Sequence, residues 1–363
     1  MSIPTRTMSS PYMQWAKTRS GARFNLASSG MRNVMPEEFP FDLADVGLSG
    51  ASFYGYAPLQ HALAQHAGVD EKNIFASIGT SMANFVALAA LVEPGDEVII
   101  EHPVYDLLPA AAGFLQASVK WLPRPESLGY QPDLDALRNT LSTHTKLIVL
   151  TNLHNPSSTY IETETMREIG RLARAVGARV LVDEVYLDVA FDAAPQSAYT
   201  LGKEFVVTNS LTKVYGLSGL RCGWVVAEPA LIERMWHLSD LFYGIPAHPS
   251  ERLSMKALAS LPALKARTRK ILDTNRGLVT GFIASRPELE CVPARFGMTL
   301  FPKLKGISVD ALCHKLRNDY ETTIVPGSFF DQPDHFRLSF GQDTAIVEEG
   351  LRRLGLALSE QIS

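Results

Sequence analysis

The sequence lacks the features that mark several large classes of protein. Its three cysteines lie far apart, are odd in number and show no Cys-x-x-Cys spacing, so neither a disulfide framework nor a zinc site is indicated. The nine histidines show no paired metal-ligand spacing such as His-Glu-x-x-His. No Gly-x-Gly-x-x-Gly turn follows a strand pattern, which argues against a dinucleotide site. Metal-dependent hydrolysis and NAD-dependent chemistry are therefore disfavoured.

Charge and hydropathy argue against two kinds of partner. The formal net charge is −4, and no cluster of lysine and arginine is interleaved with aromatic residues, so we expect no nucleic-acid partner. The longest apolar run, around residues 85–92, is too short to cross a bilayer, so we expect no membrane partner. The N-terminal segment has no apolar stretch, and the sparse cysteines suit a reducing compartment. These features predict a cytoplasmic protein.

Length and composition predict a globular protein of two domains. The 363 residues, 46% of them hydrophobic, exceed the size at which a single core usually stops growing. In the middle of the chain short apolar runs alternate with helical patterns, which predicts an α/β fold with a mostly parallel central sheet and helices on both faces. The flanking segments mix helical patterns with short strand patterns, which predicts a smaller α+β domain. We expect its N-terminal part at residues 1–69, the large domain at 70–266 and the C-terminal part of the small domain at 267–363.

Polar or aromatic side chains follow four of the predicted strands, each at its carboxyl end. They are Tyr105, Asn155, Asp183 and Lys213. Each of them alone has an ordinary structural explanation, such as a helix cap, a turn or an exposed lysine. Open α/β sheets bind their ligands at the carboxyl ends of the strands. Four such residues at equivalent places therefore predict a ligand site.

Three further segments could bind anions. Gly79, Thr80 and Ser81 follow a strand pattern and open a helical run, where free backbone N–H groups and the helix dipole favour negative charge, although the hydroxyls could simply cap the helix. Arg221 follows two glycines in a loop that is expected to bend sharply. It could bind an anion there, or it could be an ordinary exposed arginine. Arg337 lies in the predicted strand FRLSF, where it either faces solvent or meets an anion in a pocket.

Three segments together resemble a known family. NLHNPSS, LVDEVYLDVAF and SLTKVYGLSGLRCGW occur in this order, and the last fits Ser-x-x-Lys followed by Gly-x-x-Gly-x-Arg-x-Gly. Over nearly its whole length the sequence thereby resembles the class I and II aminotransferases. This resemblance implies the pyridoxal 5'-phosphate (PLP) dependent transferase fold type I, the fold of aspartate aminotransferase. It also implies an enzyme of amino-acid metabolism that moves an amino group between an L-amino acid and a 2-oxo acid.

The resemblance implies roles for single residues around PLP. Lys213 would carry the cofactor as a Schiff base, the internal aldimine, and would move the proton at the substrate Cα. Asp183 would keep the ring nitrogen protonated, because a nearby carboxylate raises the pKa of that nitrogen. The other implied ligands are Asn155 and Tyr186 at the phenolic oxygen, Tyr105 on the ring face, and Gly79, Thr80, Ser81, Ser210 and Arg221 at the phosphate.

The resemblance also implies a substrate site and a partner subunit. Arg337 would clamp the substrate α-carboxylate, with Asn155 and Gly30 beside it. The family builds each active site from two chains, which implies a homodimer. Tyr54, or alternatively Tyr56, would reach the phosphate in the neighbouring subunit.

The sequence departs from the family pattern at three places. Residues 155–158 read Asn-Pro-Ser-Ser where Asn-Pro-Thr-Gly is usual, which predicts a turn of another shape. Gln60 stands at the position of a usual arginine. The segment NLASSGM, which contains Ser29 and Gly30, lacks the common Gly-x-Pro.

Several features of the sequence bear on reactions other than transamination. The segment GLSG is a near miss to the nucleophile elbow of serine hydrolases, but Leu220 stands where that motif needs glycine. A non-catalytic PLP-fold module of a transcription regulator is disfavoured because Lys213 is intact. A PLP-dependent lyase, decarboxylase, cyclase or oxidase of the same fold stays open, since small features of the pocket decide the reaction type.

Overall fold

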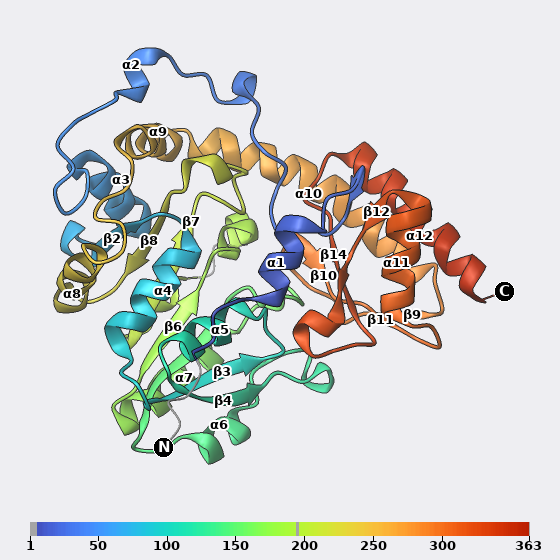
Figure 1. The fold of residues 1–363 in the computed structure, drawn as a ribbon, viewed down its shortest axis with the longest axis horizontal. Coiled ribbons are helices and arrows are strands. Elements are labelled where there is room, and N and C mark those ends of the chain that lie inside the picture. The colour runs from blue at the N-terminus through green and yellow to red at the C-terminus, as the bar shows by residue number, and fades with distance from the viewer. Residues whose placement is uncertain (1–5, 194–195, 363) are drawn as a thin grey trace.

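The computed structural model describes residues 6–193 and 196–362. Figure 1 shows a large body, built around one extended sheet, beside a smaller body of C-terminal helices and short strands. Among the described residues, none of the helices combines the length and the apolar character that crossing a bilayer requires.

The large body contains a sheet of seven strands in the order β2-β8-β7-β6-β5-β3-β4. Only β8 runs antiparallel to its neighbours. The central strands are buried along residues 147–150 and 180–182, as expected for parallel strands covered on both faces. The strands are β2 (Ile74–Ser77), β3 (Glu97–His102), β4 (Ser118–Pro123), β5 (Thr145–Thr151), β6 (Arg179–Asp183), β7 (Phe205–Ser210) and β8 (Gly223–Val226).

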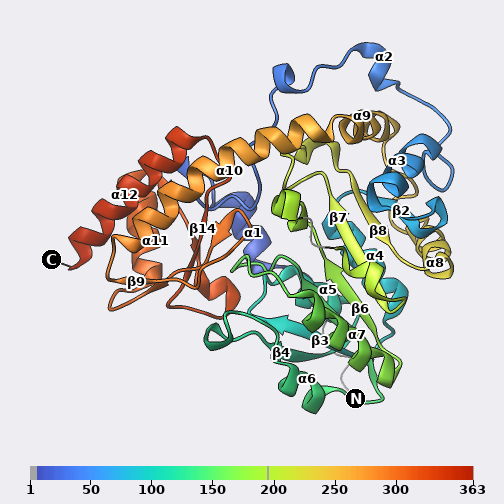
Figure 2. The ribbon, with the colours of Figure 1, turned by 180° about the vertical axis from the view of Figure 1, so that it is seen from behind.

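Helices cover the sheet on both faces, with α4 in front of it in Figure 1 and α7 in front in the reverse view of Figure 2. In α7, Met166, Ile169 and Ala173 share the buried face, and the helix ends at Gly177 in a left-handed conformation. The predicted α/β fold with a mostly parallel sheet is therefore confirmed. The helices of this body are α3 (Ala57–Ala67), α4 (Thr80–Leu91), α5 (Leu107–Phe114), α6 (Leu134–Thr140), α7 (Thr163–Val176), α8 (Pro229–Ser239) and α9 (His248–Ala259).

The smaller body holds three short sheets flanked by helices. Strand β14 lies between β10 and β13, β1 pairs with β12, and β9 pairs with β11. The strands are β1 (Phe24–Asn25), β9 (Leu289–Glu290), β10 (Thr299–Leu300), β11 (Lys303–Leu304), β12 (Thr322–Thr323), β13 (Val325–Pro326) and β14 (Phe336–Ser339). The helices are α10 (Leu261–Ala284), α11 (Val309–Tyr320) and α12 (Thr344–Ile362). Figure 2 shows α10 running from the large body into the smaller one.

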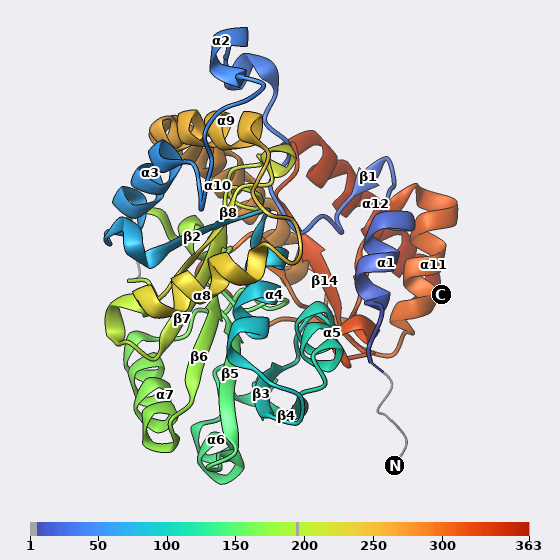
Figure 3. The same ribbon diagram turned by 60° about the vertical axis from the view of Figure 1, so that its left-hand side comes forward.

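The N-terminal segment contacts both bodies. Helix α1 (Pro11–Thr18) lies close to the place where they meet (Figure 3), and β1 joins the smaller body. Helix α2 (Leu43–Val46) projects from the large body and is tied to α9 by the Arg252 guanidinium, which donates to the carbonyls of Ala44 and Asp45 at 2.6 and 3.0 Å. Since α3 packs on α9 and β2, part of residues 1–69 accompanies the large body. The domain boundaries at residues 69 and 266 stay predictions.

Short 3-10 helices complete the connections. They are η1 (Pro36–Glu38), η2 (Glu71–Asn73), η3 (Glu126–Leu128), η4 (Leu187–Ala193), η5 (Ala198–Leu201), η6 (Ser218–Leu220) and η7 (Gly327–Phe330).

Candidate active site

A cavity at the carboxyl ends of β5 and β6 gathers residues from distant parts of the sequence. Helix α1 contributes Tyr12, Met13 and Ala16 to its wall. A neighbouring cavity, which contains Arg221, shares several of the same residues. The residues predicted from the sequence that line the first cavity are Thr80, Ser81, Tyr105, Asn155, Asp183, Tyr186 and Lys213.

Lys213 follows β7 and points its amine into this cavity. Its Nζ donates to Ser29 Oγ at 2.5 Å, and its carbonyl accepts from the N–H of Met31 at 2.9 Å. Gly30 packs on the lysine so closely that an added Cβ would lie 3.4 Å from both Cα and Cδ of Lys213. Burial lowers the pKa of Lys213 to about 8, with a further contribution from Arg337. Near neutral pH part of the amine is therefore uncharged and able to act as a nucleophile or base.

Asp183 ends β6 and is buried without a cationic partner. Its carboxylate accepts from Asn84 Nδ2 at 2.8 Å, from the N–H of Val185 at 3.1 Å and from the Tyr105 hydroxyl at 3.3 Å. Burial raises the pKa of Asp183, although these hydrogen bonds oppose the shift. Among the described residues Asp183 forms no ion pair, so a protonated ring nitrogen would meet an acceptor of the right charge.

The turn between β2 and α4 is shaped to hold an anion. Gly79 has a φ of +93° and caps α4, and an added Cβ there would lie 2.5 Å from Nη2 of Arg221. On the other side, a Cβ at Gly223 would lie 2.5 Å from the carbonyl carbon of Gly79. The buried hydroxyls of Thr80 and Thr212 have no partner among the described residues, and Arg221 donates only to backbone carbonyls, at 3.3 Å. A phosphate would satisfy these groups together with the free N–H groups of the helix.

Arg337 is a buried cation on β14. Its Nη1 donates to Asn155 Oδ1 at 3.0 Å, and its Nη2 donates to the Tyr12 hydroxyl at 2.7 Å and to the carbonyl of Ala27 at 3.1 Å. Its Nε has no partner, and no carboxylate lies within ion-pair distance in the described part of the chain. A buried charge without a counter-ion is costly, so a bound carboxylate would stabilise this arrangement.

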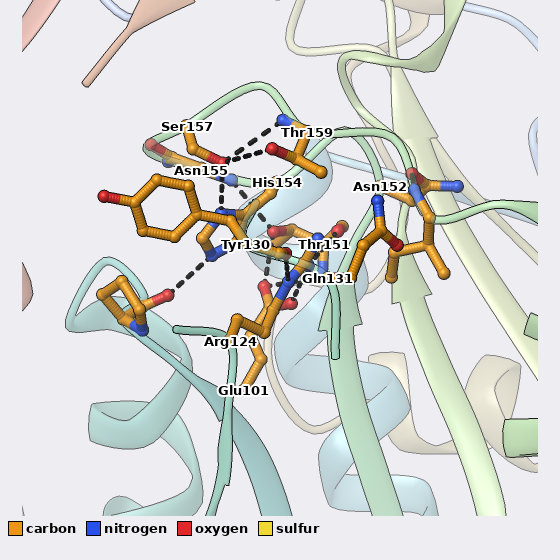
Figure 4. Close-up of polar contacts among 12 residues, drawn as sticks. Glu101, Arg124, Tyr130, Gln131, Thr151, Asn152, His154, Asn155, Ser157 and Thr159 are labelled. Carbon is orange, nitrogen blue, oxygen red and sulfur yellow. Dashed lines mark hydrogen bonds and ion pairs between the residues drawn. The ribbon is translucent and has the colours of Figure 1, made fainter. Parts of the chain in front are cut away.

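A buried ion pair supports Asn155 from below, as Figure 4 shows. Glu101 and Arg124 are both fully buried, and the Arg124 Nη1 lies 2.5 Å from the Glu101 carboxylate. The hydroxyl of Thr151 donates to Glu101 and accepts from the N–H of Asn155 at 3.1 Å. This chain of contacts fixes the backbone of Asn155 in the loop that follows β5.

His154 braces the same loop. Its ring contacts the hydroxyl of Ser157 and the carbonyl of Pro103, each at 2.7 Å (Figure 4). Burial lowers the pKa of His154 well below its usual value, and the nearby charge of Arg124 adds to this effect. The ring is therefore neutral at physiological pH and serves as a fixed brace.

Six of the predicted site residues do not line the first cavity: Gly79, Arg221 and Arg337, described above, and Gly30, Ser210 and Tyr54. Gly30 lies against Lys213, as described. Ser210 is buried and accepts from the N–H of Thr212 at 3.2 Å. Tyr54 is half exposed and donates to Asp240 at 3.0 Å, so within this chain it does not touch the cavity. A role for Tyr54 would require a second subunit.

The structure adds four residues to those expected from the sequence. They are Tyr12, Ser29, Asn84 and Thr151. Asn84 had a detectable signal, because it is a polar residue inside the otherwise apolar helical run MANFVALAALV. Tyr12 had none, since 325 positions separate it from Arg337.

Comparison with known proteins identifies the family. The model for aminotransferases of class I and II matches residues 48–354. The chain belongs to this family. It is 32% identical over 288 residues to capreomycidine synthase of Streptomyces vinaceus, covering 78% of this chain and 73% of the relative. It is 27% identical over 300 residues to an arginine–pyruvate transaminase of Pseudomonas aeruginosa, covering 80% and 76%.

A solved structure extends the likeness over the whole fold. A PLP-dependent aminotransferase from Streptococcus suis superposes with a TM-score of 0.90 at 25% identity and covers 99% of each chain. The predictions of fold type I, of PLP as the cofactor and of an aminotransferase are confirmed. The site also fits the cofactor chemically, because unsatisfied donors at the Gly79 turn, the Lys213 amine and the Asp183 carboxylate match the phosphate, the aldehyde and the ring nitrogen of PLP.

The lowered pKa of Lys213 predicts how the stability of the PLP-free protein depends on pH. The folded state binds the Lys213 proton only below about pH 8, whereas an ordinary lysine holds it to 10.5. Below pH 8 folding therefore confines a charge in an unfavourable site, and this cost falls as the pH rises from 8 to 10.5. We expect the free energy of unfolding of Lys213→Met to exceed that of the wild type by about 2 to 3 kcal/mol at pH 7. The difference should become smaller toward pH 10.

Urea unfolding of both PLP-free proteins between pH 7 and pH 10 measures this difference. Lys203→Met is the control, because Lys203 is exposed and its loss should leave the pH dependence unchanged. A constant difference between wild type and Lys213→Met across this range would contradict the assigned pKa.

Proposed function

We propose that the chain transfers the amino group of an L-amino acid to a 2-oxo acid and that Arg337 binds the α-carboxylate of both. The observation that carries this proposal is the buried guanidinium of Arg337, which has no counter-ion among the described residues and donates to Asn155 beside the Lys213 cavity. A planar guanidinium can meet a carboxylate through two parallel charge-assisted bonds. A substrate held there would present its Cα to Lys213.

The residues around the cavity divide the remaining work. PLP, when bound, supplies an electron-accepting ring that stabilises negative charge at the substrate Cα. Lys213 Nζ removes the Cα proton and returns it, and its lowered pKa suits proton transfer near neutral pH. Asp183 holds a proton on the ring nitrogen by accepting its hydrogen bond. The proposed ligands of the other parts of PLP are Asn155 and Tyr186 at the phenolic oxygen, Tyr105 on the ring face, and Gly79, Thr80, Ser81, Ser210 and Arg221 at the phosphate.

A second candidate is another PLP-dependent reaction on an amino acid, such as cyclisation, elimination or decarboxylation. It is supported by the 32% identity to a relative that is named a synthase and not an aminotransferase. Both reactions begin with the same substrate carboxylate at Arg337, so the products distinguish them.

We expect the purified protein to be yellow and borohydride to fix the cofactor to Lys213. Peptide mapping by mass spectrometry locates the reduced adduct. A panel of amino acids, each paired with pyruvate, should then produce alanine together with the matching 2-oxo acid. An adduct on another lysine would overturn the assigned site, and a cyclic or decarboxylated product without alanine would favour the second candidate.

We expect Arg337→Ala to lower kcat/KM for amino acids by roughly a hundredfold to a few thousandfold, since two charge-assisted bonds are lost. The affinity for PLP should hardly change, because the phosphate has its own ligands. Steady-state kinetics and titration of the PLP-free protein with PLP measure the two quantities. Arg317→Ala, which removes an exposed arginine from α11, is the control. Unchanged kcat/KM, or a parallel loss of PLP, would refute the role of Arg337.

We propose that the protein is a homodimer that forms through the projecting N-terminal segment. Large apolar side chains are exposed along this segment, including Leu43, Leu48 and Phe53, at 90, 89 and 84%. Leu241 is exposed at 77% on the large body. Several large apolar side chains left exposed on one projecting segment favour an interface there. Tyr54 lies on the same segment, which supports its proposed reach into the site of the partner.

We expect the double variant Leu48→Asp/Phe53→Asp to be a monomer with little activity, because two buried charges would oppose association. Light scattering should give twice the chain mass of 39.8 kDa for the wild type and the single mass for the variant. Leu356→Asp, on α12, is the control and should stay dimeric. A wild-type monomer with full activity would refute the proposed dimer.

We also propose a cytoplasmic location, which the three unpaired cysteines support. Fractionation that finds the protein in an oxidising compartment would refute it.

A further inference from the structure

The turn after Asn155 holds a serine in a conformation that favours glycine. Ser158 has a φ of +61°, in the left-handed region. Its N–H donates to the carbonyl of His154 at 2.7 Å, which closes the turn. The sequence already marked this position, because the resembling family usually has glycine there. A side chain that is kept where glycine would be unstrained needs a separate reason.

The Ser158 hydroxyl links the two bodies of the protein. It donates to the carbonyl of Thr299 at 2.8 Å and lies 2.9 Å from the hydroxyl of Thr299, which in turn donates to the carbonyl of Pro156 at 3.2 Å. Both side chains are buried, so water does not compete for these bonds. Gly297 provides the space, since a Cβ there would lie 2.3 Å from Ser158 Oγ.

These bonds join the loop that carries Asn155 to β10, the strand that pairs with the strand of Arg337. Thr299 lies on β10 and pairs with Ser339 of β14. Ser339 is two residues after Arg337 on the same strand. Asn155 lies three residues before Ser158 in the loop that follows β5. The direct bond between Arg337 and Asn155, at 3.0 Å, therefore closes a ring of contacts whose other side is the link from Ser158 to Thr299.

We infer that Ser158 is a positioning residue that fixes Arg337 relative to Asn155 across the two bodies, and so sets the geometry in which the substrate carboxylate is bound. This inference depends on the proposed role of Arg337. Ser158 touches neither the substrate nor the cofactor in this role, and it acts only through Thr299 and the pairing of β10 with β14.

The decisive variant is Ser158→Gly, because glycine accepts the positive φ and the turn should fold without the hydroxyl. We expect KM for the best amino acid of the panel and for its 2-oxo acid to rise about three- to tenfold, the effect of losing one buried hydrogen bond. We expect kcat to stay within about twofold, because the bound substrate and the transition state are weakened equally. The dissociation constant of PLP should also stay within about twofold, because the phosphate ligands are untouched.

Ser157→Ala is the matched control. Ser157 is also buried in this loop, but its partners among the described residues, His154 and Thr159, belong to the same loop. It separates an effect on the loop itself from an effect on the link to Thr299, and it should leave the hydrogen-exchange protection of residues 297–300 and 336–340 unchanged. Thr299→Ser keeps the hydroxyl and should behave as the wild type, whereas Thr299→Val loses the bond to Pro156 and should raise KM in the same direction as Ser158→Gly.

Hydrogen exchange supplies a readout that does not depend on catalysis. In Ser158→Gly, but not in Ser157→Ala, backbone amides of residues 297–300 and 336–340 should exchange faster, because the link that holds these segments to the loop is gone. Unchanged exchange and unchanged KM in Ser158→Gly overturn the inference. If Arg337→Ala also leaves KM unchanged, the proposed substrate site fails; if Arg337→Ala raises KM while Ser158→Gly does not, only the positioning role fails.

Discussion

The arrangement of the site depends on one constraint, the burial of the Arg337 charge without a counter-ion in the described part of the chain. A guanidinium in that position must find neutral acceptors until a carboxylate arrives, and Asn155, Tyr12 and Ala27 supply them. These acceptors come from three separate segments, the loop after β5, helix α1 and the stretch after β1, and all three meet Arg337 on strand β14. The ion pair of Glu101 and Arg124 then holds the loop from the opposite side.

Asp183 and Lys213, two ionisable groups of the cavity, have pKa values that depart from the usual ones in opposite directions. Burial raises the pKa of Asp183 and lowers that of Lys213, so the site disfavours charge on both groups while no ligand neutralises it. A cofactor that would bring a protonated ring nitrogen to Asp183 and a carbonyl to the Lys213 amine would relieve both of these costs. Relief of these two costs therefore favours binding of the cofactor.

The sequence predicted the fold class and the gathering of Tyr105, Asn155, Asp183 and Lys213, because parallel strands end at one edge of a sheet and place their next residues together. It predicted less about contacts between segments. Tyr12 approaches Arg337 only through the packing of α1 against the smaller body, and no local pattern encodes that approach. The turn at residues 155–158 was expected to differ from the family, but only the position of Thr299 gives the difference a physical reason.

Helix α10 extends from the large body into the smaller one. It has 24 residues, hence a length of about 36 Å, and it runs between the two bodies as a rigid rod (Figure 2). A tilt of about 5° at its first turn would move its far end by about 3 Å, on the order of a hydrogen-bond length. The protein therefore has a mechanical lever built into its backbone, and short bonds between the bodies must oppose even small rotations if the carboxylate site is to keep its shape.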